Sequence, residues 1–338
     1  MDTFIAIGEN IHCTRSFKRG GAYVMESPQP AVLYHEAGQQ KALPIPEPFL
    51  STAEWRDGKV RHCAVAAFQG LRGQGAQREA GTHYIQALAR SQEQAGAAFL
   101  DINVDEFGAN VQDRIAAVEW AVRTVRTVSA LPLSIDSSNP DVIRAGLEAW
   151  GRDVRPWPLV NSFSLERLGL LDLLKAYRPA VVVSAAGARD LPVAIQDRMN
   201  NVSAALAHVT AAGIPLNRIY VDPLVYTIST DSANGRICVE AVAAIRKTLG
   251  PEIHITGGFS NVSFGMPARK LINQVFTWLC VQAGADSGIV DPLQINAALL
   301  KALDPASEPF RLARALLLGE DEFGVEFIAA HREGRIAS

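Results

Sequence analysis

Acidic and amide side chains follow short apolar runs at many points along this chain of 338 residues. A carboxylate can accept two parallel N–H bonds, and a carboxamide both donates and accepts hydrogen bonds. Together these groups suit the amidine-like edge of a heteroaromatic ring, such as a 2-amino-4-oxo pteridine. The positions are Glu9, Asn10, Asp101, Asn103, Asp136, Asn161, Asp222, Ser260, Asn261 and Asp291.

Other roles are open at each of these positions. Asp and Asn commonly cap helices or form turns, so a single residue of this kind is weak evidence for a site. Three or more carboxylates around magnesium would use similar residues, and spacing alone leaves that alternative open. Lys, Arg and His are almost absent from the set, which argues against phosphate as the principal ligand group.

Residues 254–263 show the pattern most clearly. An apolar run reaches Gly257 and Gly258 and is followed by Ser260 and Asn261. The glycines allow backbone torsions closed to other residues and let a flat ligand approach the main chain. We expect His254, at the start of this strand, to lie at the other end of the strand and to take no part in catalysis.

The elements that position these side chains alternate along the chain. Apolar runs of strand length are separated by segments of helical period, which predicts an α/β fold, a (β/α)8 TIM barrel. Such barrels carry their active site at the carboxyl ends of the strands, so we expect the polar residues to gather there. The runs lie at 4–7, 99–104, 131–136, 159–164, 180–185, 219–224 and 287–292, with one more before Gly257.

We expect the barrel to span residues 1–303 and a C-terminal helical extension to span 304–338. Residues 12–76 are rich in Pro and Gly and lack a sustained helical period, which predicts an irregular insertion after the first strand. The His and Cys residues of this insertion lack the spacing of a zinc motif, so we predict no metal site. They are His12, Cys13, His35, His62 and Cys63.

The composition excludes several classes of function. A net charge of -3 lacks the excess of positive charge that nucleic-acid-binding proteins carry. The four cysteines lie far apart and indicate no disulfide framework. Neither a signal segment nor an apolar run of about 18 residues is found, so we expect a cytoplasmic protein without membrane contact. We also expect a homodimer, to which the C-terminal tail could contribute.

Several motifs, in matching order, resemble the pterin-binding barrel shared by dihydropteroate synthases and methyltetrahydrofolate:corrinoid protein methyltransferases. They are Asp136-Ser-Ser-Asn139, Val160-Asn-Ser162, Tyr220-Val-Asp-Pro223 and Gly258-Phe-Ser-Asn-Val-Ser263. The last of these and Leu100-Asp-Ile-Asn-Val104 favour the methyltransferase branch. The Arg-x-His ending and the phosphate-binding Lys of a dihydropteroate synthase are not found beside Asp291-Pro292.

The resemblance implies methyl transfer between nitrogen 5 of tetrahydrofolate and the cobalt of a corrinoid. It assigns Asn261 to the neighbourhood of nitrogen 5, where its amide would stabilise developing charge. Because a carboxamide is not a strong acid, we expect the proton to arrive through a network with water or from an acid such as Asp101. Glu9 would be structural. The residues that would bind the folate are Asp136, Asn161, Asp222, Asn103, Gly258 and Ser260.

The chain has no Asp-x-His-x-x-Gly segment of the kind that binds cobalamin, so the corrinoid would arrive on a partner protein. The insertion at 12–76 could shape the surface where that partner docks, or it could have no role in docking. Two other functions remain open. One is a dihydropteroate synthase or other pterin-using barrel enzyme, and the other is a folate-binding subunit without activity.

Overall fold

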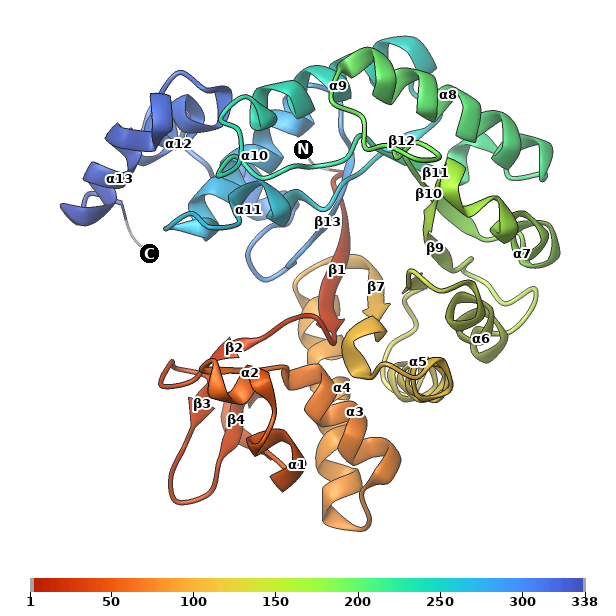
Figure 1. The fold of residues 1–338 in the computed structure, drawn as a ribbon, viewed down its shortest axis with the longest axis vertical. Coiled ribbons are helices and arrows are strands. Elements are labelled where there is room, and N and C mark those ends of the chain that lie inside the picture. Colours follow the sequence, from red (N-terminus) through yellow and green to blue (C-terminus); the bar gives the residue numbers. More distant parts are fainter. Residues whose placement is uncertain (1–2, 337–338) are drawn as a thin grey trace. The chain divides into compact units, whose positions relative to one another are not determined.

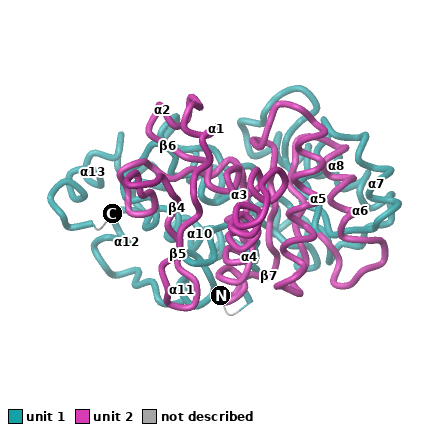
Figure 2. The backbone as a smooth tube through the Cα atoms, turned by 90° about the horizontal axis from the view of Figure 1, so that it is seen from below, with its two compact units in different colours: residues 1–7, 159–338 teal, residues 8–158 magenta. Residues whose placement is uncertain are grey.

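The computed structural model describes residues 3–336 and divides the chain into two compact units. Unit 1 contains residues 1–7 and 159–338, and unit 2 contains residues 8–158 (Figure 2). Eight strands of one sheet, β1 and β7 to β13, alternate with helices along the chain (Figure 1). The predicted (β/α)8 fold is therefore confirmed.

Unit 1 holds a run of parallel strands, β9 (Leu159–Phe163), β10 (Ala180–Ser184), β11 (Ile219–Asp222) and β12 (His254–Ile255). A parallel bridge from Gly258 to Ile289 adds β13 (Ser287–Val290). Every residue of β10 is buried, as expected for a parallel strand covered on both faces.

The helices of unit 1 follow these strands in turn. None of the described helices of the chain has both the length and the hydrophobicity needed to span a membrane. The helices are η2 (Leu165–Leu170), α7 (Leu171–Tyr177), α8 (Ile195–Ala211), η3 (Leu216–Arg218), α9 (Asn234–Leu249), η4 (Phe259–Ser263), α10 (Arg269–Gln282), α11 (Ala297–Lys301), α12 (Glu308–Leu318), η5 (Glu322–Gly324) and α13 (Val325–Arg332).

Unit 2 pairs β7 (Ala97–Asn103) with β8 (Leu133–Asp136) in parallel. From residue 62 onward its helices are α3 (His62–Arg72), α4 (Ala76–Gln94), η1 (Asp105–Phe107), α5 (Val111–Arg126) and α6 (Pro140–Trp150). Gly81 of α4 lies so close to α3 that a Cβ at this position would be 2.4 Å from the carbonyl oxygen of Ala66. Glycine at this position therefore sets how closely the two helices pack.

The first strand is longer than the sequence predicted. We expected it to end before Glu9, but β1 runs from Ile5–His12. Asn10 can continue the strand inside the fold because its backbone N–H donates to Oε1 of Gln92 at 3.0 Å. The prediction that Glu9 and Asn10 stand after the strand is therefore wrong, and His12 is the last residue of the strand.

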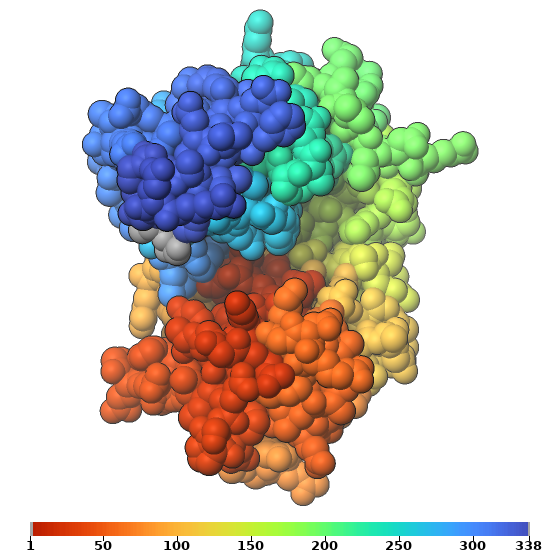
Figure 3. Space-filling view, turned by 60° about the vertical axis from the view of Figure 1, so that its left-hand side comes forward, coloured from red at the N-terminus to blue at the C-terminus, as the bar shows by residue number. Residues whose placement is uncertain are grey.

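The segment 12–76 also differs from the irregular backbone that we expected. It forms a two-stranded sheet of β2 (Phe17–Lys18) and β6 (Lys59–Val60), a three-stranded sheet, and the short helices α1 (Glu47–Leu50) and α2 (Ala53–Arg56) before α3. The three-stranded sheet contains β3 (Val24–Met25), β4 (Ala31–Glu36) and β5 (Gln39–Pro44). Side chains of this segment form much of one face of unit 2 (Figure 3).

The hairpin between β4 and β5 explains why the pattern was missed. Its turn is Ala37-Gly38, and both residues have positive φ, of 50° and 77°. A two-residue turn of this kind matches the twist of a hairpin, but alanine is an unusual residue at its first position. Val32 and Leu43 pair across the hairpin and are fully buried, which supplies its apolar face.

Candidate active site

In unit 2, polar side chains stand at the carboxyl ends of three strands. His12 ends β1, Asn103 ends β7 and Asp136 ends β8. The register pairs Asn103 with Asp136, and Nδ2 of Asn103 donates to Oδ2 of Asp136 at 2.9 Å. The structure thus brings together Asp101, Asn103 and Asp136, as the barrel prediction requires of neighbouring strands.

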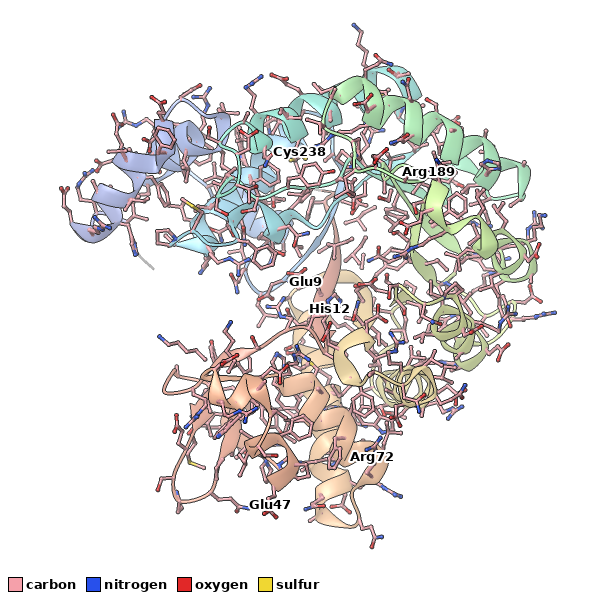
Figure 4. All side chains as sticks on the ribbon, in the orientation of Figure 1. Glu9, His12, Glu47, Arg72, Arg189 and Cys238 are labelled. Atoms are coloured by element: carbon pink, nitrogen blue, oxygen red, sulfur yellow. The ribbon has the colours of Figure 1, made fainter. Side chains whose placement is uncertain are left out.

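His12 joins this group although we placed it in the insertion. Its Nε2 lies 2.6 Å from Oδ2 of Asp101, whose side chain is completely buried. Figure 4 shows Glu9 and His12 on β1, with His12 nearer the carboxyl end of the strand. The polar residues Glu9 and Asn10 interrupt the apolar run before His12, so no local sequence pattern marks His12 as part of the strand.

The charges in this group influence one another. Burial by itself lowers the pKa of His12, yet the hydrogen bond and charge of Asp101, with the charges of Asp136 and Glu9, together raise that pKa above its ordinary value. The pKa of Asp136 is raised to about 7, by burial of its carboxylate first and by the charge of Asp101 next. His12 and Asn103 oppose this rise.

One ligand atom from each of His12, Asp101 and Asp136 lies within 4.8 Å of the others, which raises the question of a metal. Two ligand atoms that lie about 2.1 Å from a metal ion at right angles are about 3 Å apart. The 2.6 Å contact between His12 and Asp101 is shorter and matches a charge-assisted hydrogen bond. The geometry therefore favours a proton between these two groups.

Residues after the strand ends fix the loops around the group. The backbone N–H of Asp105 donates to Oδ1 of Asn103 at 3.0 Å. The carboxylate of Asp105 in turn accepts from Oγ of Ser137 and from the backbone N–H of Ser138, so η1 is tied to the end of β8. Asn139 caps α6 through the N–H groups of its first turn, which gives the end of the Asp136-Ser-Ser-Asn139 motif a structural role.

Glu9 lies earlier on β1 and forms an ion pair of 3.1 Å with Arg15. Whether Glu9 has the expected structural role stays a prediction.

In unit 1, Asp222 ends β11. Its Oδ1 accepts from the backbone N–H of Leu224 at 2.8 Å, and its own carbonyl oxygen accepts from the N–H of Ala185 at 2.9 Å. Burial raises the pKa of Asp222 to about 6, against the lowering effects of the Leu224 hydrogen bond and the charge of Arg198. The carboxylate is thus held in place on one side by its own loop.

Arg198 is a residue that the sequence did not single out. It is 1% exposed, and its Nη1 donates to the carbonyl oxygens of Pro223 and Leu224 at 2.6 Å each. Its guanidinium also lies 5.0 Å from the centre of the Tyr226 ring. Position 198 falls on an ordinary helical segment, so no sequence signal marks the residue.

Asn161 lies within β9, half-buried, and its position pairs with Val182 of β10. The register between these strands shifts directly afterwards, and the peptide bond from Asn161 to Ser162 is cis. Asn161 is therefore the middle residue of β9, whereas Asp222 is the last residue of β11.

Asn261 stands on the short helix η4, beyond β12, with its side chain exposed. Its backbone N–H donates to the carbonyl oxygen of Gly258 at 3.0 Å, and a Cβ at Gly258 would lie 2.9 Å from Nδ2 of Asn261. Glycine at position 258 thus leaves room for the Asn261 amide. The carbonyl oxygen of Ser260 accepts from Nη2 of Arg269 at 2.9 Å, which anchors the turn.

Two polar residues of unit 1 have structural partners. His254, the first residue of β12, bonds through Nδ1 to Oδ2 of Asp286 at 2.9 Å and stacks on Tyr220. Asp291 follows β13 and accepts from the N–H of Leu293 at 3.1 Å and from Nε2 of Gln294 at 2.8 Å. That His254 takes no part in catalysis stays a prediction.

Comparisons with known proteins extend over most of the chain. Residues 75–291 match the family described as pterin binding enzyme. Methylcorrinoid:tetrahydrofolate methyltransferase of Eubacterium limosum is 28% identical over 258 residues, which are 75% of this chain and 89% of that protein. Methionine synthase of Mycobacterium leprae is 30% identical over 222 residues, which are 62% of this chain but only 18% of that protein.

Solved structures show the same fold at low identity. Dihydropteroate synthase of Xanthomonas albilineans superimposes with a TM-score of 0.52 and 20% identity, covering 68% of this chain and 84% of that one. Dihydropteroate synthase of Stenotrophomonas maltophilia gives a TM-score of 0.53 and 17% identity, covering 67% and 87%. These likenesses concern the fold alone.

Proposed function

Because the chain belongs to the family of pterin-binding enzymes, we propose that it transfers a methyl group between nitrogen 5 of tetrahydrofolate and the cobalt of a corrinoid carried by a separate protein. The observation that carries the proposal is the placement of half-buried acceptor groups at strand ends, Asp136 with Asn103 in unit 2 and Asp222 in unit 1. The match over 89% of the length of a methylcorrinoid:tetrahydrofolate methyltransferase supports this reaction among those of the family.

The carboxylates of Asp136 and Asp222 suit the N–H groups of the pterin, because ionised carboxylates only accept hydrogen bonds. We assign Asn161 to the same ring, since a carboxamide can satisfy a ring atom of either polarity. Other residues would complete the folate pocket through their backbone or amide groups. They are Asn103, Gly258 and Ser260.

Asn261 would act at nitrogen 5. The methyl group leaves readily only when this nitrogen carries a proton or gains one during transfer, because an amide anion is too basic to depart. The exposed Asn261 amide can hydrogen-bond to nitrogen 5 as its charge changes, which stabilises the transition state more than the bound substrate. The reduced cobalt of the corrinoid supplies the nucleophile that accepts the methyl group.

For Asp101 we propose a different role from that of a proton donor. Its side chain is completely buried and its Oδ2 is hydrogen-bonded to His12. The proton of this hydrogen bond is held between two buried side chains, so it is not available to nitrogen 5. The proton for nitrogen 5 would then come from water near the exposed Asn261.

An absorbance assay tests the reaction directly. The protein is mixed with tetrahydrofolate and either methylcobalamin or a methylated corrinoid protein, and the cobalt spectrum is followed over time. Loss of the methylcobalt bands with formation of 5-methyltetrahydrofolate is the expected result. Tetrahydrofolate binding without any spectral change would contradict the proposal and favour another pterin reaction, such as that of a dihydropteroate synthase.

That the chain forms a homodimer and that it lies in the cytoplasm both stay predictions. Sedimentation experiments, which give the mass of the particle in solution, would test the first.

A further inference from the structure

We propose that His12 is a positioning residue that offsets the charge of Asp101, so that the neighbouring Asp136 can hold the pterin as an ionised carboxylate. This inference rests on the proposed function and adds to it a residue that acts through another. His12 touches neither the pterin nor the methyl group in this scheme. Its role follows from the contacts and charges at the ends of β1, β7 and β8.

The contact between His12 and Asp101 is built into the fold. His12 is 9% exposed and Asp101 is fully buried, and their side chains meet at 2.6 Å. The second carboxylate oxygen of Asp101, Oδ1, is buried and has no hydrogen-bond partner among the described residues. A buried carboxylate with so few partners is costly to keep ionised unless a cation lies beside it.

Asp136 gives this pairing its functional importance. Oxygen atoms of Asp101 and Asp136 fall within the same 4.8 Å group as Nε2 of His12. Two carboxylates that share a poorly solvated site resist simultaneous ionisation, and one of them then keeps its proton to a higher pH. A protonated Asp136 could no longer accept two N–H bonds from the pterin.

The other charged groups around Asp136 do not supply the missing cation. Asp105 on η1 and Glu9 on β1 add negative charge to the group. Arg15 is engaged with Glu9 through an ion pair of 3.1 Å. Asn103 donates a hydrogen bond to Asp136 but carries no charge. Among the described residues, His12 is therefore the basic group that contacts Asp101 directly, and it lies in the same group as Asp136.

A set of charge-altering variants separates this role from a purely structural one. His12→Gln keeps a side-chain donor for Asp101 but removes the cation. Asp101→Asn removes the neighbouring negative charge, and the double variant removes both. His83→Gln is the matched control, because His83 is exposed on α4 of the same unit.

The measurement is the dissociation constant for tetrahydrofolate, determined anaerobically by calorimetry between about pH 6 and pH 9. We expect the wild-type affinity to fall as Asp136 gains a proton at low pH. His12→Gln should raise the pH at which affinity is half lost by about one unit or more. Asp101→Asn should lower it, and the double variant should return close to the wild type. The His83→Gln profile should coincide with the wild-type profile.

The double variant distinguishes the two explanations. If His12 only held the strand ends together, removing Asp101 as well would leave the His12→Gln defect in place or make it worse. An unchanged profile for His12→Gln, or a defect that does not depend on pH, would overturn the inference. Failure of the wild type to bind tetrahydrofolate at any pH would instead contradict the proposed function. Thermal melting of each variant confirms that all are folded.

Discussion

Nδ2 of Asn103 donates a hydrogen bond of 2.9 Å to Oδ2 of Asp136, although the two residues are 33 positions apart in the chain. The register of β7 and β8 places them side by side, and the N–H of Asp105 holds Oδ1 of Asn103, so its amide nitrogen faces the carboxylate. This hydrogen bond favours the ionised form of Asp136 and lowers its pKa against the effect of burial.

Asn103→Ala should therefore weaken folate binding most where Asp136 titrates. A hydrogen bond to a charged group contributes about 1.5 kcal/mol, so we expect roughly tenfold weaker binding near pH 7. Because the pKa of Asp136 is about 7, the deficit should shrink at higher pH, where the carboxylate is ionised in both proteins. Calorimetric titration with tetrahydrofolate checks this, and a deficit of constant size across the pH range would contradict it.

Arg198→Met should destabilise unit 1. The change leaves the carbonyl oxygens of Pro223 and Leu224 without their donor, in a region where the arginine is 1% exposed. Unpaired buried acceptors cost about 1 to 3 kcal/mol each, so the free energy of unfolding should fall by about 2 to 4 kcal/mol. Urea denaturation followed by circular dichroism measures the loss.

Arg189→Met is the control for this change, because Arg189 is exposed and precedes α8 (Figure 4). A surface substitution of this kind should alter the free energy of unfolding by less than about 0.5 kcal/mol. Equal losses in the two variants would show that the buried guanidinium contributes nothing to the loop after β11.

The strand alternation predicted the fold because buried parallel strands are short runs of aliphatic residues, as in Ala180–Ser184. The same pattern predicted where Asp136 and Asp222 stand, since each is the last residue of its strand. His12 was missed because polar residues inside β1 are satisfied by side chains from elsewhere in the fold, which no local pattern reveals. The role of Arg198 likewise depends on carbonyl groups about 25 residues further along the chain.

Asn261→Ala should lower the rate of methyl transfer far more than folate affinity. Loss of one donor that acts mainly in the transition state typically lowers kcat about a hundredfold or more. Asn261 is exposed on η4, and its amide fits beside Gly258 because the glycine has no side chain. Truncation of Asn261 should therefore leave the fold intact. Single-turnover kinetics with methylcobalamin give the rate, and calorimetry gives the affinity.

Asn200→Ala is the corresponding control, because Asn200 is exposed on α8. It should change neither the rate nor the affinity. If Asn261→Ala weakens folate binding by as much as it slows transfer, then Asn261 is a binding residue and its assignment to nitrogen 5 is wrong.

His62 predicts a pH dependence of stability that is independent of ligand. Burial first, and the charge of Arg15 second, lower the pKa of His62 from 6.5 to about 3. Its Nδ1 faces the hydroxyl group of Tyr84 at 2.9 Å and its ring stacks on Phe17, so the folded state holds the neutral imidazole. The stability that His62 contributes is complete above its ordinary pKa of 6.5 and is lost as the pH falls toward 3.

The loss should amount to about 1.4 kcal/mol for each pH unit below about 6.5. Asp136 and Asp222 work in the opposite sense, because their raised pKa values make the folded state bind protons more tightly as the pH falls. The effect of His62 is therefore isolated by comparing urea denaturation of the wild type and His62→Gln at several pH values. The difference between the free energies of unfolding of the wild type and His62→Gln should narrow as the pH falls from about 6.5 to 4.5. His35→Gln is the control, because His35 is exposed on β4, and its free energy of unfolding should follow that of the wild type at each pH. A difference that stays constant with pH would show that His62 is not held neutral by the fold.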